Sequence, residues 1–304
     1  MPRGWYLAQG LIPLGTSSSD DEEGPCELPN GRLVCGPHGL VCCGKCCTDY
    51  SFMDSENEGQ DDDSLGSKVE ATDSDPAADP LDPLRLRRGT GRAFPTRFVP
   101  PSASITPLEL FSGQRSHIRI TRYTLGNDAR KVLIRTDGAC LDNGQQNPKA
   151  GWAFWHGFGP SGQLLVASGR LEKTGPFGDD SMQTSNRAEL RAVIAALRFR
   201  HWPGEGFHAL VIATDSEYVV EGSVKWAKTW LENGWVKRGG GGVKNRDLWE
   251  ALLGEIERYK DEGMAVEFWK IPREWNIVAD AAAREAAAKE EVSDEWMEVI
   301  GMNI

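Results

Sequence analysis

Four carboxylic acids in the second half of the sequence stand where a folded chain can bring them together. Asp137 follows a short apolar run in KVLIRTDG, and Asp215 follows another in ALVIATDS. Glu189 lies near the start of one helical pattern, and Asp280 near the start of another. In open α/β sheets, ligands bind outside the carboxyl ends of strands. Clustered carboxylates repel one another unless a cation neutralises them, so the set predicts a site for Mg²⁺, with Mn²⁺ as a substitute.

The chemistry expected of such a site is phosphodiester cleavage, because two ions about 3.5–4 Å apart can activate water and stabilise a leaving oxygen. Each acid alone also has a structural explanation. Asp137 precedes a glycine as in a turn, and Asp215 precedes a serine that could join it in capping a helix. Glu189 and Asp280 suit the N-terminal turn of a helix. The four together favour the metal site.

Hydrophobic patterning predicts the elements that must position these acids. We expect strands at 131–138, 149–157, 164–172, 209–216 and 265–272, and helices at 187–200, 218–232, 248–260 and 278–291. Gly-rich turns join the first three strands, and helices separate the later ones. This order predicts an α/β fold with a five-stranded mixed sheet, three antiparallel strands followed by two parallel ones, flanked by helices.

The negative charge is concentrated in the first third of the chain. The 304 residues carry a net charge of −11, of which residues 1–100 account for −8. Those residues are rich in Ser, Asp, Pro and Gly and hold one of the eleven Trp, so we predict a largely disordered region. A net negative charge usually argues against a nucleic-acid partner. Residues 101–304, however, carry a net charge of only −3, so this argument does not apply to them. We expect a lead-in over 101–129, a catalytic domain over 130–291 and a tail over 292–304.

The motifs around the four acids resemble the ribonuclease H family. They are Asp-Gly after the first strand, NRAEL on the first helix, TDSEYV after the fourth strand and NIVAD before the last helix. TDSEYVVEG, WAKTWLENGW and VKNRDLW resemble the cellular type 1 enzymes, which cleave RNA in RNA–DNA hybrids. The resemblance covers 130–290 and implies a ribonuclease H-like fold, endonucleolytic hydrolysis to 5′-phosphate and 3′-hydroxyl ends, and an RNA–DNA hybrid as partner.

The resemblance also implies roles for single residues. Asp137 would bridge both ions, Asp280 would complete the site of the ion that activates water, and Glu189 and Asp215 would hold the ion near the leaving oxygen. The family's Asn or Gln four residues before Glu189 is here Ser185, which has a shorter reach. Contacts to the RNA strand and its 2′-hydroxyl are implied for Gly138, Ala139, Cys140, Asn143, Thr184, Ser185 and Asn186.

The segment 223–246 resembles the basic protrusion with which the family grips the DNA strand. It interleaves aromatic faces with cations, a mixture suited to bases, sugars and phosphates. Trp226 and Trp230 are four residues apart and could instead pack on the helix beneath them. The candidate contacts are Trp226, Trp230, Trp235, Lys237, Arg238, Lys244 and Asn245.

One position departs from the family pattern. Ten residues before the last acid, family enzymes usually carry a His on a mobile loop, and this chain has Lys270. A Lys stays protonated near carboxylates, so it could place a charge but would be a poor proton shuttle at neutral pH. We therefore expect a slower but active nuclease. The alternative is a hybrid-binding or scaffold protein with weak or no nuclease activity, against which the four intact acids argue.

Six of the seven Cys fall within residues 26–47. The patch at 26–52 contains Cys35-x-x-His38 and Cys43-x-x-Cys46, whose spacing suits a tetrahedral Zn²⁺ site. A set of reduced thiols is the alternative. The patch resembles a short Cys-rich segment of fungal proteins, so the chain reads as a fungal-looking enzyme with a Cys-rich extension. The region could also bind a protein partner.

The sequence predicts an intracellular protein, of the nucleus or the cytoplasm. No apolar run approaches the roughly 18 residues of a membrane span. An odd number of cysteines, mostly in one patch, argues against a secreted disulfide framework. The segment 85–92, RLRRGTGR, is too short to indicate a nuclear signal.

Overall fold

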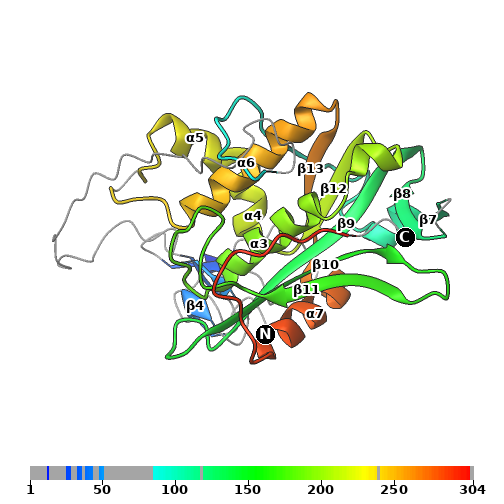
Figure 1. The fold of residues 1–304 in the computed structure, drawn as a ribbon. Helices are drawn as coiled ribbons and strands as arrows, with labels where there is room; N and C mark the ends of the chain where they lie inside the picture. The colour runs from blue at the N-terminus through cyan, green and yellow to red at the C-terminus, as the bar shows by residue number, and fades with distance from the viewer. Residues whose placement is uncertain are drawn as a thin grey trace.

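The computed structural model describes residues 85–116, 119–237 and 240–301, together with short stretches before residue 51. The largest element is an eight-stranded mixed sheet with the order β11-β10-β8-β9-β12-β13-β6, and β7 pairs with β8 outside this path (Figure 1). The five strands expected from the sequence are all present: β9 (Asp128–Leu141), β10 (Lys149–Phe158), β11 (Leu164–Arg170), β12 (Ala209–Thr214) and β13 (Ala265–Lys270).

The strand directions agree with the predicted fold class. β9, β10 and β11 run antiparallel, while β12 is parallel to β9 and β13 is parallel to β12. Every residue of β12 is buried, as expected of a parallel strand covered on both faces. Alternation along β9 sends Val132 and Ile134 to one core and Leu133 to the other.

Helices cover both faces of the sheet. α3 (Ser185–Arg198), α4 (Glu217–Glu221) and α6 (Arg246–Asp261) pack on one face, and α7 (Ile277–Ala288) packs on the other (Figure 1). The helix expected over 218–232 is α4 followed by a π-helical turn, Gly222–Trp226, and α5 (Ala227–Glu232). The π turn begins at Gly222, which packs directly against the ring of Trp249. A Cβ at this position would lie well under 3.0 Å from that ring, so the close contact requires glycine.

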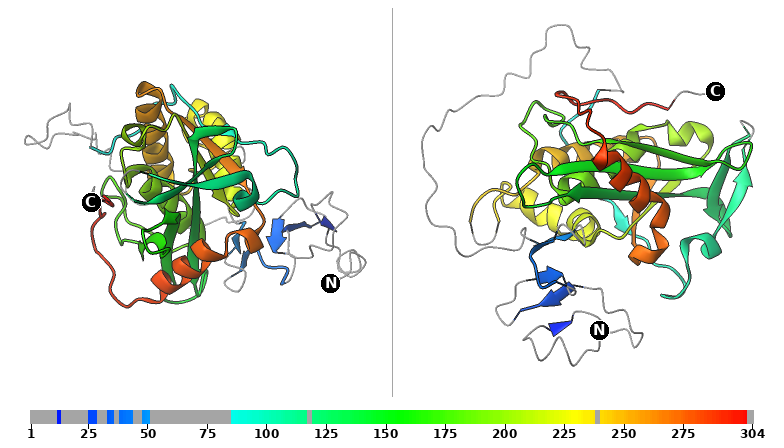
Figure 2. Two further views of the ribbon diagram at one scale, coloured as in Figure 1. Left: turned by 90° about the vertical axis from the view of Figure 1, so that its right-hand side faces the viewer. Right: turned by 90° about the horizontal axis from the view of Figure 1, so that it is seen from below.

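Three further strands come from residues that the sequence analysis assigned to the lead-in and the N-terminal region. β7 (Phe111–Arg115) and β8 (Thr121–Leu125) form a hairpin, and β8 continues into β9 through another tight turn. β6 (Thr96–Arg97) adds a parallel edge strand to β13. In the views of Figure 2, the cyan segment that leads to β6 lies against the sheet and its helices.

The segment 85–98, which we call the strap, crosses α6 before it reaches the sheet. The backbone N–H groups of Thr90, Gly91 and Arg92 all donate to one carboxylate oxygen of Glu257, at 2.7–3.1 Å. Gly89 passes so close to Gly254 that a Cβ on either would lie under 3.0 Å from backbone atoms. The sequence RRGTGR is therefore used to bind a helix carboxylate.

The chain after α7 returns along α3. Arg191 is buried, donates to Glu172 and to the carbonyl of Met297, and lies 3.9 Å from the ring of Trp296. The N–H of Gly301 donates to the carbonyl of Phe199 at 2.7 Å. The described part of the predicted tail is thus packed on the domain.

Short strands also occur in the Cys-rich region. β2 (Pro25–Glu27) pairs with β1 (Ile12–Pro13) and β3 (Leu33–Cys35), and β4 (Cys42–Cys43) pairs with β5 (Thr48–Asp49). Most of the predicted disordered region lies outside the described residues. Among those described, no helix is long and apolar enough to cross a membrane.

Candidate active site

The register of two parallel strands places Asp137 beside Asp215. Arg135 of β9 pairs with Ala213 of β12, and the two acids stand two residues further along their chains. Asp137 is still within β9 and is 2% exposed, whereas Asp215 follows the last residue of β12. The two acids therefore lie side by side where the pairing of β9 with β12 ends.

Glu189 reaches the same place because α3 lies unusually close to β9. A Cβ on Gly138 would stand well under 3.0 Å from the backbone N of Glu189, so only glycine permits this approach. Thr184 caps α3 by accepting a hydrogen bond from the N–H of Arg187 at 3.3 Å. Glu189 therefore projects from the first turns of a helix whose position is fixed against the strand.

Carboxylate oxygens of Asp137, Glu189 and Asp215 all lie within 4.8 Å of one another. Burial raises the pKa of Asp137 well above its ordinary value, and the charges of Asp215, Glu189 and Asp280 raise it further. Burial and Asp215 also raise the pKa of Glu189, against the opposing effect of Arg273 and the backbone of Gly138. The acids therefore oppose one another's ionisation, and a bound cation would relieve this repulsion.

This group of acids fits a divalent metal ion. Hard carboxylate oxygens are the ligands of Mg²⁺ and Mn²⁺, and a bound cation would remove the repulsion that raises these pKa values. The fit rests on the crowding of these donors, of which Asp137 and Glu189 are buried and Asp215 is half-buried.

Asp280 stands at the rim of this group, on the first turn of α7. Its carboxylate accepts a hydrogen bond from Arg284 at 3.0 Å and forms an ion pair with Arg273. Its charge contributes to the raised pKa of both Asp137 and Glu189. All four predicted acids therefore belong to one electrostatic site, with Asp280 engaged by arginines.

Arg273 is a cation that faces several of the carboxylates, and it was not predicted from the sequence. Burial lowers its pKa, but the charges of Asp215, Asp280 and Asp137 outweigh this effect and raise the pKa above its ordinary value. Lys270, at the end of β13, is exposed, and within the described residues no hydrogen bond or ion pair joins it to the four acids. Arg273 belongs to the Pro-Arg-Glu sequence just after β13, so its place near the end of a strand was visible in the sequence.

Asn276 is a second residue that the sequence analysis did not single out. It is fully buried, and its side-chain amide donates to Asp215 at 2.8 Å and to the carbonyl of Thr136 at 2.9 Å. It therefore links the start of α7 to β9 and to the residue that follows β12. The NIVAD motif contains this residue, so the sequence did carry the signal.

The candidate RNA contacts lie around the start of α3. Asn143 donates to the Ser185 hydroxyl at 3.2 Å, and both side chains are almost fully buried. Ala139 and Cys140 are buried in β9, and Asn186 is buried at the start of α3. The structure thus brings Asn143, Ser185 and the end of β9 together, as a shared site requires.

The three candidate tryptophans of the basic segment pack on the core. The rings of Trp226 and Trp230 are 5.9 Å apart, and Trp230 lies 5.5 Å from Trp249. Trp235 is 6% exposed and has a φ of 64°. These contacts match the packing alternative stated for Trp226 and Trp230 and extend it to Trp235.

The cations of the same segment are more accessible than its aromatic rings. Lys244 is exposed and Lys237 is half-buried, while Asn245 donates to the hydroxyl of Tyr218 at 3.2 Å. Arg238 lies outside the described residues. The described cations therefore leave a charged surface beside the start of α6.

The predicted zinc ligands are only partly described. Cys35 is buried in β3, and His38 is exposed three residues later. Cys43 lies in β4, but its side chain and the whole of Cys46 lie outside the described residues. The four-ligand set therefore stays a prediction.

The fold and the site together define a class of protein: a mixed α/β sheet that holds a crowded carboxylate group suited to a divalent ion. A sequence model of the RNase H family matches residues 129–288. The chain belongs to the ribonuclease H family and is a hydrolase of that type.

Individual relatives agree with this family. A ribonuclease H of Treponema pallidum is 43% identical over 125 residues, covering 40% of this chain and 70% of the relative. A ribonuclease H of Aeromonas hydrophila is 34% identical over 166 residues, covering 55% of this chain and 96% of the relative. Among solved structures, RNase H1 of Halobacterium salinarum is 23% identical, with a TM-score of 0.32, and covers 51% of this chain and 96% of its own.

Proposed function

We propose that this protein is a type 1 enzyme that cleaves the RNA strand of RNA–DNA hybrids endonucleolytically and leaves 5′-phosphate and 3′-hydroxyl ends. The observation that carries the proposal is the group of Asp137, Glu189 and Asp215, whose oxygens lie within 4.8 Å of one another and of which the first two are buried. Such a group is costly unless a cation occupies it. Its place at the strand ends of a ribonuclease H domain supports phosphodiester hydrolysis.

Asp137, Glu189, Asp215 and Asp280 would hold the divalent ions. Bound there, two ions would activate water and stabilise the leaving oxygen. Asn276 orients Asp215 through the hydrogen bond of 2.8 Å. Arg273, paired with Asp280, holds a permanent positive charge at the edge of the site, where it can attract and orient a phosphate.

The RNA strand would be recognised at the start of α3. Asn143, Ser185 and the end of β9 offer amide, hydroxyl and backbone groups within one small region. A 2′-hydroxyl both donates and accepts, so such a mixed set could distinguish RNA from DNA. The accessible cations Lys237 and Lys244, together with Arg238 and Asn245, would contact the DNA strand.

Cleavage of a labelled RNA–DNA hybrid in the presence of Mg²⁺ tests the proposal. The wild type should cut the RNA strand and leave duplex DNA intact, and analysis of the fragment ends should show 5′-phosphates. The Asp137→Asn variant is the matched control, because it keeps the size of the side chain and removes its charge. Hybrid binding without cleavage by the wild type would contradict the proposal.

We infer further that Cys35, His38, Cys43 and Cys46 bind Zn²⁺. The His-and-Cys donor set suits this ion, and the pairing of β2 with β3 and of β4 with β5 supports an ordered patch around it. Metal analysis of the purified full chain should find zinc in proportion to protein. The Cys46→Ser variant should lose it, whereas Cys140→Ser should not.

The alternative of a hybrid-binding protein without turnover has no support in these comparisons. An intracellular location and a protein partner for the N-terminal region remain proposals from the sequence. The catalytic domain over 130–291 is proposed to act together with the strap, because the strap is hydrogen-bonded to α6.

A further inference from the structure

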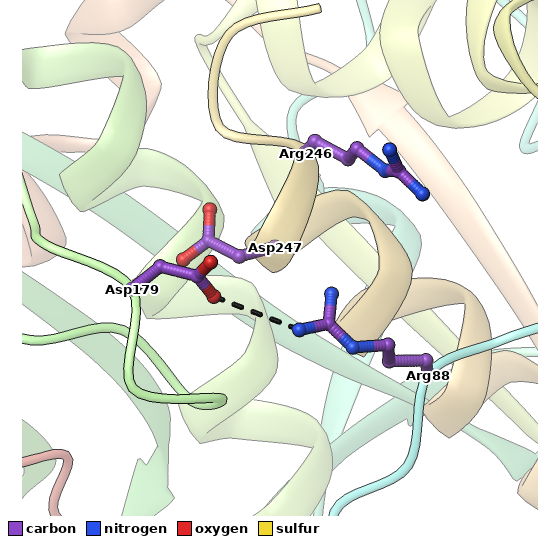
Figure 3. A pocket seen from close by; sticks show the side chains of 4 residues that line it. All are labelled: Arg88, Asp179, Arg246 and Asp247. Carbon is purple, nitrogen blue, oxygen red and sulfur yellow. Dashed lines mark ion pairs between the residues drawn. The ribbon is translucent and has the colours of Figure 1, made fainter. Parts of the chain in front are cut away.

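An open cavity of about 500 Å³ lies at the start of α6, apart from the four acids. Figure 3 shows the side chains that line it: Arg88, Asp179, Arg246 and Asp247. They come from three segments, because Arg88 belongs to the strap, Asp179 to the loop before α3, and the other two to the first turn of α6. Two of the four are arginines, each about half exposed.

One buried acid, Glu250, binds both arginines and fixes their positions. Glu250 has a 6% exposed side chain, accepts from Arg246 at 2.7 Å and pairs with Arg88. Arg88 also lies 4.1 Å from the ring of Phe177, which supports the flat face of its guanidinium group. An arginine has five N–H donors in a fixed fork, so each keeps donors that Glu250 does not use.

The acids beside the cavity compete weakly for those donors. Asp247 is buried and is already bound by both terminal nitrogens of Arg187, at 2.8 and 2.5 Å. Asp179 is half exposed and stands 3.8 Å from Arg88, beyond hydrogen-bonding distance. An exposed pair of this kind contributes little and is readily replaced by a stronger anion.

The cavity lies next to the proposed nucleic-acid surface. Arg246 directly follows Lys244 and Asn245, and Arg187, which binds Asp247, stands two residues before Glu189 on α3. Arg88 lies outside the residues 129–288 that match the family, so this part of the site belongs to the extension of this chain.

We propose that Arg88 and Arg246 form a binding site for a phosphodiester group of the nucleic acid, on a strand that continues past the four acids. Two fixed guanidinium forks match the geometry of phosphate oxygens better than lysines would. The strap thereby becomes part of the substrate-binding surface as well as a structural element. The inference rests on the proposed function, because it takes the same hybrid as ligand.

Binding of a fluorescent RNA–DNA hybrid to the full chain, measured over a range of salt concentrations, tests this site. The Asp137→Asn background prevents cleavage during the measurement. Adding Arg88→Ala should weaken binding several-fold and reduce the slope of log K against log salt by about 0.9, the value for one lost phosphate contact. Arg92→Ala is the matched control, because Arg92 lies on the same strap, is equally exposed and pairs with Asp261 further along α6.

A second variant is needed because Arg88→Ala could weaken binding by disturbing the fold. Asp179→Asn leaves both arginines and removes the competing charge, so it should tighten hybrid binding about two- to threefold. In the active enzyme, Arg88→Ala should raise KM and leave kcat nearly unchanged. An unchanged salt slope for Arg88→Ala, or an equal loss for Arg92→Ala, would overturn the site.

The outcomes also separate this site from the proposed function. Cleavage by the wild type with unchanged KM in Arg88→Ala would reject the site and leave the function in place. Binding that depends on Arg88, without cleavage by the wild type, would support the site and reject the function. A wild type that binds no hybrid would reject both.

Discussion

Arg273 forms an ion pair with Asp280 across the turn that joins β13 to α7. The pair puts a permanently charged guanidinium at the edge of a site in which three other carboxylates are crowded together. The charges of Asp215, Asp280 and Asp137 raise the pKa of Arg273, so its charge is secure at any working pH. The cation paired with this group of acids is therefore an arginine, which can orient a phosphate but cannot exchange protons.

Replacing Arg273 should lower turnover. We expect Arg273→Ala to reduce kcat at least tenfold, about 1.4 kcal/mol of transition-state stabilisation, because it removes the positive charge that opposes the acids. Arg273→Lys should restore part of the activity. The measurement is steady-state cleavage of a hybrid at saturating Mg²⁺.

Lys270→Ala is the matched control for this prediction. Lys270 is exposed and lies in β13 three residues before Arg273, so its loss should change kcat less than threefold. A larger effect of Lys270→Ala than of Arg273→Ala would contradict the role assigned to Arg273. Lys270→His would then test whether a proton-exchanging group at this position raises turnover.

Asp137→Asn should abolish cleavage and yet stabilise the metal-free protein at neutral pH. Burial and the neighbouring acids raise the pKa of Asp137, so its ionisation opposes folding. A carboxyl group with a raised folded-state pKa has no such cost below its unfolded pKa of about 3.9, and the cost grows as the pH rises towards the raised value. The Tm in EDTA should therefore increase at pH 7.5 and not at pH 3.5, by roughly 2–4 °C per kcal/mol.

Adding Mg²⁺ tests the same carboxylate site in the opposite direction, by stabilising the charged form of the acids. A ligand that binds only the folded state raises its stability, so Mg²⁺ should raise the Tm of the wild type. The shift should be much smaller in Asp137→Asn, which lacks one of the donors. Equal shifts in both proteins would place the ion elsewhere.

Gly138→Ala should damage both the fold and the site. The added Cβ would lie well under 3.0 Å from the backbone of Glu189, so α3 must move away from β9. Overpacking of this kind costs about 1–3 kcal/mol, and the movement also displaces Glu189. Gly242→Ala is the control, because nothing lies within 4 Å of a Cβ at that position. Thermal unfolding and hybrid cleavage of both variants check the prediction, which equal Tm values would contradict.

The acids could be predicted from the sequence because their placement follows from local patterns. Asp137 and Asp215 each follow an apolar run, and parallel strands bring such ends together. The contact between Arg273 and Asp280 depends instead on how the chain turns after β13. Lys270, ten residues before Asp280, is still paired in the strand with Thr214, and its side chain is exposed.

The strap and Trp235 show a second limit of the sequence. Residues 85–98 have a polar composition that favours disorder, yet Glu257, more than 160 residues away, orders them through three backbone amides. Trp235 stands among lysines and glycines, but its carbonyl accepts from Val243 and its N–H donates to the carbonyl of Trp230, which draws the ring into the core. The order of the strap depends on a contact distant in sequence, and the burial of Trp235 depends on how its own loop turns back on α5, neither of which follows from composition and spacing.

Substitutions of Trp235 and Lys244 should therefore change different properties: the first should lower stability, and the second should weaken hybrid binding. Trp235→Ala should lower the free energy of unfolding by about 3–5 kcal/mol, because it empties a buried volume. Lys244→Ala should leave the Tm within one degree or so and reduce the salt slope of hybrid binding by about 0.9. Thermal unfolding and anisotropy titrations of the two variants make the comparison. A stable Trp235→Ala with weakened binding would instead support a direct contact of this ring with the nucleic acid.

The contact between Glu257 and the strap should control the local stability of residues 89–92. Three N–H groups converge on one oxygen of Glu257, and hydrogen bonds to a charged acceptor are roughly twice as strong as neutral ones. Glu257→Gln keeps the size of the side chain and removes the charge, so amide hydrogen exchange at Gly91 and Arg92 should become faster, while amides in β9 remain protected. Asp261→Asn breaks only the exposed ion pair with Arg92, which contributes little, and should leave exchange unchanged. If both variants exchange at the same rate, the ion pair holds the strap as firmly as the amide cluster does, and the role given to Glu257 is wrong.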